Sequence, residues 1–189
     1  MHNNNNPLNK GAPAAPSVRR DELVSYLDDL LKNHEVAGDG SNNGLQIEGN
    51  DEVQQAVFGV DACEELFRAA ANNGADFVFV HHGLSWGSNL KYLTGLAARR
   101  IRVLMQHGLS VYASQLPLDR HPELGHNAAI CDALGITERA PFFKYDGVNI
   151  GFYGRIPEPQ PVATIANTLN VTLTAASFVL AENSSEAVD

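Results

Sequence analysis

The sequence DFVFVHHG at residues 76–83 gives the clearest indication of the fold, because an almost wholly apolar run ends there in a pair of histidines. Such a run is typical of a strand that is buried on both faces of a sheet. Residues 53–60 predict another strand, and residues 64–73 predict a helix that Asn73 and Gly74 end. These segments together predict a βαβ unit.

Helices and strands continue to alternate on both sides of this unit. Leucines at helical spacing between residues 23 and 31 predict an amphipathic helix that ends before Gly38. We therefore expect an α/β fold, with a mainly parallel sheet and flanking helices. The further expected elements are a helix at 90–107, a strand at 109–114 and a helix at 127–134.

The two ends of the chain carry weaker patterns. Residues 1–17 contain an Asn run with Pro, Gly and Ala but no apolar periodicity, so we expect a disordered tail. Near the other end, residues 148–156 predict a strand, 162–169 predict a short helix, and 171–180 are β-rich in composition. The predicted domains are the tail (1–17), an α/β domain that carries the candidate metal site (18–138) and a partial second segment (139–189).

Composition and charge exclude several classes of protein. The 189 residues include 13 basic and 22 acidic side chains, a net charge of −9, which disfavours binding to a nucleic-acid polymer. The two cysteines are far apart and predict neither a disulfide framework nor a zinc-thiolate site. No apolar run reaches the length of about 18 residues that a membrane span needs, and the first residues show neither the basic nor the apolar region of a signal peptide. We expect a cytoplasmic protein with no membrane association.

The residues that follow two predicted strands suggest a metal site. His81 and His82 end the apolar strand, and Asp119 lies in the loop LPLDRHPELGHN (116–127) that follows the next strand. Ligands bind at the carboxyl ends of such strands, and imidazole beside a carboxylate suits a divalent cation. His121 or Glu123 would hydrogen-bond to these ligands. Alternatively, the histidines are polar loop residues bonded to backbone carbonyls, and Asp119 is a turn or helix-cap residue.

The sequence NNGLQIEG at residues 42–49 has two interpretations. Its Gly- and Asn-rich start is able to bring backbone amides to an anion, but it has no Lys and no P-loop spacing. A turn that enters a short strand is the interpretation that its turn-forming residues favour.

The order of four motifs resembles a known family. NNGLQIEG, GVDA, DFVFVHHGLSW and LPLDRHPELGHNAAICDALGI are similar to the dinuclear-metal-centre family labelled GTP cyclohydrolase 1 type 2 homologues, which are NGG1-interacting-factor-like. The resemblance runs from about Leu23 to Ile136. It implies an α/β fold of two related halves, a ring-shaped homohexamer, and metals bound by His81, His82 and Asp119.

Two positions depart from the family pattern. Gln115 stands where the family commonly has a His, and no His follows His126. The family completes its site with a His and a Glu four residues apart near the C-terminus. We therefore expect the chain to be the first half of the two-half fold, truncated before that second ligand motif.

These observations leave three functions open. The first is a metal-dependent hydrolase that acts on a small nucleotide-like substrate through a metal-bound water. The second is a non-catalytic metal-binding oligomeric scaffold or regulatory protein, and the third is an inactive truncated homologue. The ligand types suit Zn, Fe, Ni or Mn, and the sequence does not choose among them.

Overall fold

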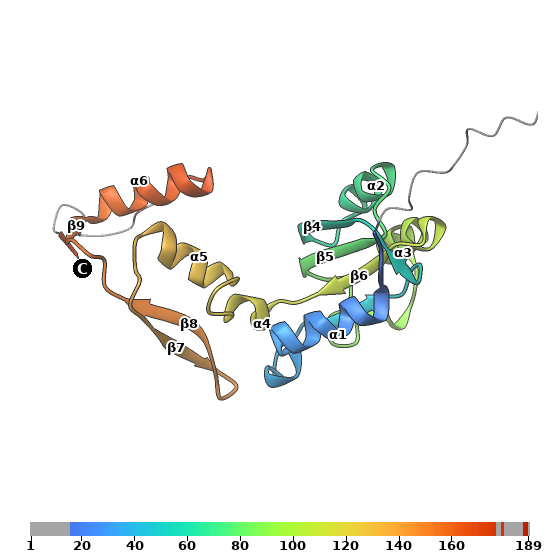
Figure 1. Cartoon of the computed structure of the whole chain (residues 1–189), viewed down its shortest axis with the longest axis horizontal. Coiled ribbons are helices and arrows are strands. Elements are labelled where there is room, and N and C mark those ends of the chain that lie inside the picture. The colour runs from blue at the N-terminus through green and yellow to red at the C-terminus, as the bar shows by residue number, and fades with distance from the viewer. Residues whose placement is uncertain (1–15, 177–178, 180–186, 189) are drawn as a thin grey trace, which may run out of the picture.

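The computed structural model of the protein describes residues 16–176, 179 and 187–188, and a four-stranded sheet forms the core of the right-hand lobe in Figure 1. The strand order is β2–β6–β5–β4. Strands β4, β5 and β6 are parallel, whereas β2 is antiparallel to β6. The strands are β2 (Gly44–Ile47), β4 (Ala56–Asp61), β5 (Phe77–His82) and β6 (Ser110–Ala113).

Helices cover both faces of this sheet and bury β5 between them. Phe77 and Phe79 pack with apolar residues of one helix, α1, whereas Val78 and Val80 pack with those of α2 and α3 on the opposite face. This alternation follows from the two-residue period of a strand. Burial of each such side chain stabilises the fold by about 1.5–3 kcal/mol. The helices are α1 (Arg20–Leu31), α2 (Glu64–Asn72) and α3 (Gly95–His107).

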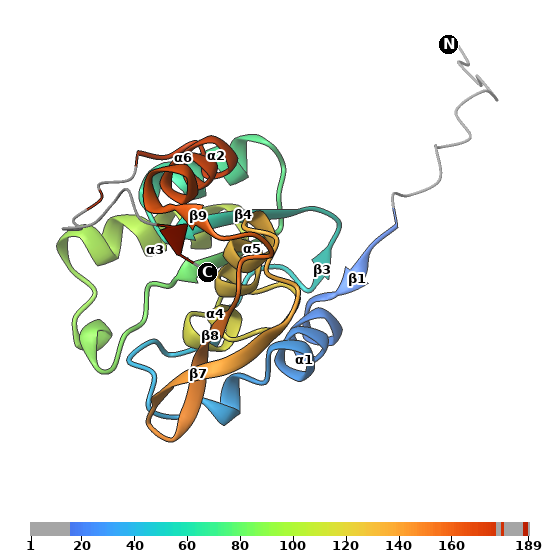
Figure 2. The ribbon, with the colours of Figure 1, turned by 90° about the vertical axis from the view of Figure 1, so that its left-hand side faces the viewer.

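Beyond β6 the chain leaves the sheet through a one-turn helix and builds a second lobe (Figures 1 and 2). We call residues 18–119 the sheet lobe, 120–125 the link, and 126–173 with β10 the C-terminal lobe. A small cluster around the buried residues Cys131, Ile136 and Ile156 holds the C-terminal lobe together. Its elements, and the helix before them, are α4 (Leu116–Asp119), α5 (His126–Ala133), β7 (Arg139–Tyr145), β8 (Val148–Gly154), β9 (Gln160–Pro161), α6 (Val162–Leu173) and β10 (Ala187–Val188).

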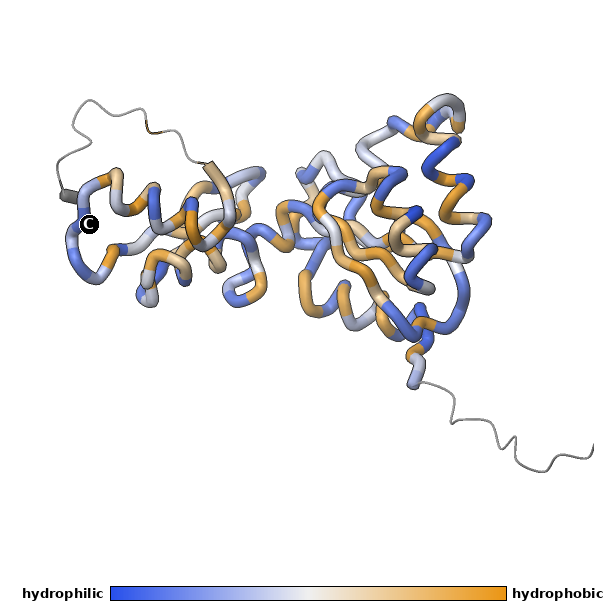
Figure 3. Tube along the Cα trace, turned by 90° about the horizontal axis from the view of Figure 1, so that it is seen from above, coloured by the Kyte–Doolittle hydropathy of each residue, from blue (hydrophilic) through white to orange (hydrophobic). Residues whose placement is uncertain are grey.

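Short elements complete the structure. Strand β1 (Val18–Arg19) pairs with β3 (Glu52–Val53), and β9 pairs with β10, both antiparallel. Two short 3-10 helices, η1 (Asn33–Glu35) and η2 (Asn89–Lys91), lie in connections. Figure 3 shows hydrophobic residues along the strands of the central sheet.

The expectation of a mainly parallel sheet is wrong, because the sheet is mixed and the C-terminal hairpin of β7 and β8 is antiparallel. Strand β2 has only four residues, and its partner β6 lies far along the chain. No local sequence pattern therefore indicates that β2 runs antiparallel to β6. The sequence interpretation also missed β7. Pro141 lacks an N–H and weakens the strand pattern, but it is tolerated in a two-stranded hairpin.

Most predicted helices and strands are confirmed, with three differences in extent. The helix expected at 90–107 begins at Gly95, after exposed Tyr92 and Leu93. The strand expected at 53–60 is divided between β3 and β4. Residues 171–173, expected to favour strand, end helix α6, because the weak strand preference of β-branched residues does not stop a helix that has already begun at Val162.

Some expectations fall on residues outside the described part of the chain. The predicted tail lies there except for residues 16 and 17, and so do residues 177, 178 and 180 of the β-rich segment. In the described part, no helix is long and apolar enough to cross a membrane.

Candidate metal centre

His81 and Asp119 meet at the carboxyl edge of the sheet. His81 is the fifth residue of β5, and Asp119 ends α4, which follows the neighbouring parallel strand β6. Because adjacent parallel strands end at the same edge, the two segments lie side by side. His81 Nε2 is 2.9 Å from Asp119 Oδ1.

His126, the first residue of α5, joins this pair. Its Nδ1 is 2.8 Å from Asp119 Oδ1, and its ring centroid is 4.6 Å from that of His81. The potential ligand atoms of His81, Asp119 and His126 all lie within 4.8 Å of one another. We call these three residues the His-Asp-His cluster. Two imidazole nitrogens and a carboxylate oxygen form a donor set that suits a borderline divalent cation.

The Asp119 carboxyl is ionised at neutral pH, the form that binds a cation. Burial raises its pKa, but hydrogen bonds from His81 and His126 outweigh burial, and the pKa lies below its ordinary value. The side chain is therefore an anion at neutral pH. Exposure increases across the cluster, from 11% for the His81 side chain to 21% for Asp119 and 51% for His126, so the His126 side faces solvent.

His82 lies beside the cluster but belongs to a separate pair. Its Nδ1 is 2.8 Å from Oδ1 of Asp61, which ends β4 opposite His82 in the parallel register. Its ring centroid is 4.5 Å from that of His81. A carboxylate on Nδ1 favours the tautomer whose Nε2 has a free lone pair. His82 is thus able to act as a ligand, but it is outside the His-Asp-His cluster.

His121 and Glu123, expected as hydrogen-bonding partners of the ligands, are used differently. His121 Nδ1 accepts hydrogen bonds from the backbone N–H groups of Glu123 and Leu124, at 3.2 and 3.0 Å. Glu123 is exposed. The side-chain hydrogen bonds of the Asp119 carboxylate come instead from His81 and His126. The contacts of His121 shape the link between α4 and α5.

A side chain at Gly125 would collide with the backbone of this link. An added Cβ would lie 2.5–2.7 Å from the carbonyl oxygens of Leu118, Asp119 and His121. The Gly125 N–H also donates to the His121 carbonyl at 3.1 Å. Close backbone packing therefore sets the short distance between Asp119 and His126.

Amide side chains from the segment that enters β2 brace both ligand-bearing loops. Gln46 Oε1 accepts hydrogen bonds from the N–H groups of Leu84 and Ser85 at 2.7 and 2.9 Å, just after the histidine pair. Asn43 Oδ1 accepts from the Gln115 N–H at 2.9 Å, just before α4. The short strand expected here is confirmed as β2, and these side chains add a positioning role.

Sequence reasoning missed three kinds of site residue. His126 was in the quoted loop, but its position next to Asp119 depends on the compact link. Asp61 carried a usable signal, since it ends the strand beside β5. The sequence contains no signal for the bracing roles of Asn43 and Gln46, because no local pattern indicates which loops their side-chain amides contact.

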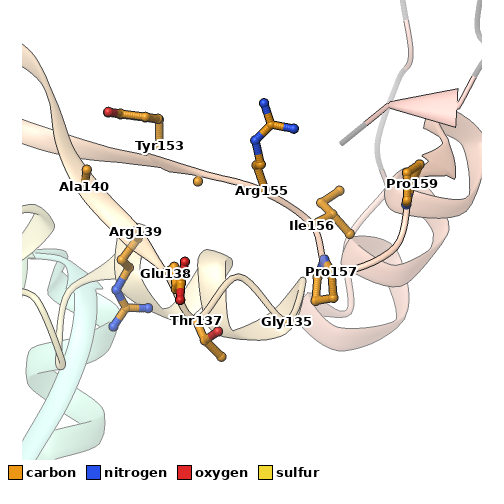
Figure 4. A pocket seen from close by; sticks show the side chains of 11 residues that line it. Gly135, Thr137, Glu138, Arg139, Ala140, Tyr153, Arg155, Ile156, Pro157 and Pro159 are labelled. Atoms are coloured by element: carbon orange, nitrogen blue, oxygen red, sulfur yellow. The ribbon is translucent and has the colours of Figure 1, made fainter.

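An open hollow of about 940 Å³ lies elsewhere, in the C-terminal lobe. Figure 4 shows Glu138, Arg139, Tyr153 and Arg155 around it, on the connection to β7, on β7 and along and just beyond β8. No residue of the His-Asp-His cluster lines it. The chemistry of the side chains, and not concavity, identifies the candidate site.

The sequence and the fold are similar to those of known proteins. The profile of the family described as Duf34/NIF3 (NGG1p interacting factor 3) matches residues 18–189. Two proteins named GTP cyclohydrolase 1 type 2 homolog are similar: one from Pyrococcus horikoshii is 43% identical over 150 residues, 79% of this chain and 59% of that protein. The other, from Archaeoglobus fulgidus, is 45% identical over 148 residues, 78% of this chain and 60% of that protein.

A solved structure gives the same result. The crystal structure of TTHA1606 from Thermus thermophilus is 41% identical in sequence, with a TM-score of 0.71 over 82% of this chain and 61% of that chain. The chain thus spans about three fifths of the length of these relatives.

Proposed function

The chain belongs to the Duf34/NIF3 family, and from this premise we propose that it binds a divalent cation through His81 and Asp119 and acts as a metal-dependent hydrolase. The observation that carries the proposal is the meeting of an anionic carboxylate with imidazole nitrogens at one edge of the sheet. Imidazole nitrogens together with a carboxylate oxygen are a common donor set for divalent cations in proteins.

Each residue has a definite task in this proposal. Asp119 supplies the negative charge and an oxygen ligand, and His81 supplies Nε2 from the rigid end of β5. His82 is oriented by Asp61 and offers a further nitrogen next to His81. A bound cation of this type supplies Lewis acidity and lowers the pKa of a coordinated water. The exposed side of the cluster leaves room for that water and a substrate.

The substrate we propose is a small nucleotide-like molecule. The names of the relatives refer to GTP cyclohydrolase. These names are our reason for proposing a nucleotide and not another hydrolysable compound. Zn, Fe, Ni and Mn all fit the ligand types, so the identity of the ion is a matter for measurement.

A non-catalytic metal-binding scaffold is the second candidate. It is favoured by the placement of His121 and Glu123, two residues of the link whose side chains are able to act as an acid or a base. His121 Nδ1 is occupied by backbone N–H groups, and Glu123 is exposed on the link. A hydrolase needs a proton donor or acceptor within hydrogen-bond reach of its substrate, whereas a scaffold does not.

We also propose that copies of the chain associate, as a homohexamer in the cytoplasm. Large apolar side chains are exposed on the sheet lobe, among them Phe58 at 73%, Val60 at 60% and Tyr92 at 80%. Phe58 and Val60 lie on β4, which is an edge strand of the sheet. Exposed apolar residues on an unpaired edge favour association.

The test is to measure metal content and hydrolysis on the same samples. Protein without a His tag is purified as wild type, as the double variant His81→Ala/His82→Ala and as Asp119→Ala, and each sample is analysed by plasma mass spectrometry. GTP and other nucleoside triphosphates are then incubated with each sample, and the products are separated by chromatography.

We expect near-stoichiometric metal in the wild type and loss of metal in both variants. Turnover of a nucleotide that disappears with the metal would establish the hydrolase. Stoichiometric metal without turnover would favour the scaffold, and a well-folded wild type with negligible metal would contradict both candidates.

A further inference from the structure

We propose that His126 is a direct ligand of the cation, and that the bound cation fastens the C-terminal lobe to the sheet lobe. This inference rests on the proposed function, because it concerns the same cation, but it assigns a ligand and a structural effect that the proposal does not include. It starts from the His-Asp-His cluster, in which His126 Nδ1 and His81 Nε2 share the same oxygen of Asp119.

The three residues of the cluster come from different parts of the structure. His81 is the last but one residue of the buried strand β5, and Asp119 ends α4, so both belong to the sheet lobe. His126 begins α5, the first element of the C-terminal lobe. An ion bound by all three would therefore join the lobes, which Figure 1 shows connected through α4 and the link.

The C-terminal lobe holds α5 firmly. Arg139 on β7 donates hydrogen bonds to the Ala128 carbonyl and to Asp132 on α5, at 3.1 and 2.6 Å, and it also bonds to the Pro122 carbonyl in the link. Asn127, the neighbour of His126, donates to the Ile150 carbonyl of β8 at 2.8 Å. These hydrogen bonds couple the position of His126 to that of the hairpin of β7 and β8.

The geometry of the cluster also suits direct binding. The ligand atoms already lie within 4.8 Å of one another, so a small cation needs only slight side-chain adjustment to reach all three. Two histidines and one carboxylate occupy one side of an ion and leave the other side open. The open side would face solvent beside His126, half of whose side chain is exposed.

The experiment uses the full chain, stripped of metal, with Zn²⁺ as the probe. Zinc affinity is measured by calorimetry for the wild type, His126→Asn and His126→Gln, the second variant guarding against a folding defect of the first. His107→Asn is the matched control, since His107 is exposed at the end of α3 in the sheet lobe. Hydrogen exchange of peptides that cover residues 120–133 is followed with and without saturating zinc.

We expect both His126 variants to lose more zinc affinity than the about 10- to 100-fold that follows loss of a ligand's hydrogen-bond partner, and His107→Asn to match the wild type. Zinc should slow exchange at 120–133 in the wild type but not in the saturated His126 variants. Unchanged affinity or equal protection in the variants would overturn the inference alone. A wild type that binds no zinc would overturn the proposed function as well.

Discussion

Gly125→Ala is the substitution that most directly tests how the link positions the cluster. The added Cβ would lie 2.5 Å from the carbonyl oxygens of His121 and Leu118 and 2.7 Å from that of Asp119. All three are backbone atoms, so the link itself must move. Overpacking of this kind costs about 1–3 kcal/mol, and the reduced freedom of the unfolded chain offsets about 0.4–1 kcal/mol of it.

From the middle of each range the net loss is about 1.3 kcal/mol, which for a chain of this size lowers the melting temperature by about 3–5 °C. Thermal unfolding of the metal-free protein, followed by circular dichroism, measures it. The control is Gly40→Ala, because its added Cβ would approach only the Trp86 ring, at 3.9 Å. Equal melting temperatures for the two variants would contradict the view that a side chain at residue 125 forces the backbone of the link to move. Zinc titration should show weaker binding for Gly125→Ala and unchanged binding for Gly40→Ala.

Three further substitutions test other features. Gln46→Met leaves the N–H groups of Leu84 and Ser85 without their acceptor and should cost about 1–3 kcal/mol in urea unfolding; wild-type stability would contradict the bracing role. Because the pKa of Asp119 is lowered in the folded state, its ionised form stabilises the fold above about pH 4. In the metal-free proteins, the free energy of unfolding of the wild type should exceed that of Asp119→Asn, and this difference should decrease as the pH falls below about 4. A difference that does not depend on pH would contradict the role of the ionised carboxylate. Phe58→Asp should shift gel filtration towards smaller species, and an unchanged profile would exclude β4 as the contact.

Local sequence patterns predicted the sheet lobe well, because its core depends on periodicity. The alternation in β5 sends Phe77 and Phe79 to one helix layer and Val78 and Val80 to the other. The helices there end at residues that the sequence marks, such as Gly108 after α3, whose left-handed φ of 62° glycine adopts easily.

The parts that were missed depend on contacts between distant segments. The direction of β2 follows from its pairing with β6, and β7 is stabilised by β8 despite Pro141. At the candidate site, the parallel strands made the approach of His81 and Asp119 predictable. The contact of His126 with Asp119 was not predictable, because it depends on the path of the link.

The hydrogen bond between His81 and Asp119 also bears on the order in which the protein folds. It joins residues 38 positions apart, and the intervening chain includes α3 and β6, so we expect this contact to form late in folding. Contacts that form after the rate-limiting step of folding affect the rate of unfolding much more than the rate of folding. On this expectation, removal of Asp119 should leave the refolding rate about unchanged and raise the unfolding rate, which stopped-flow measurements on Asp119→Asn would check.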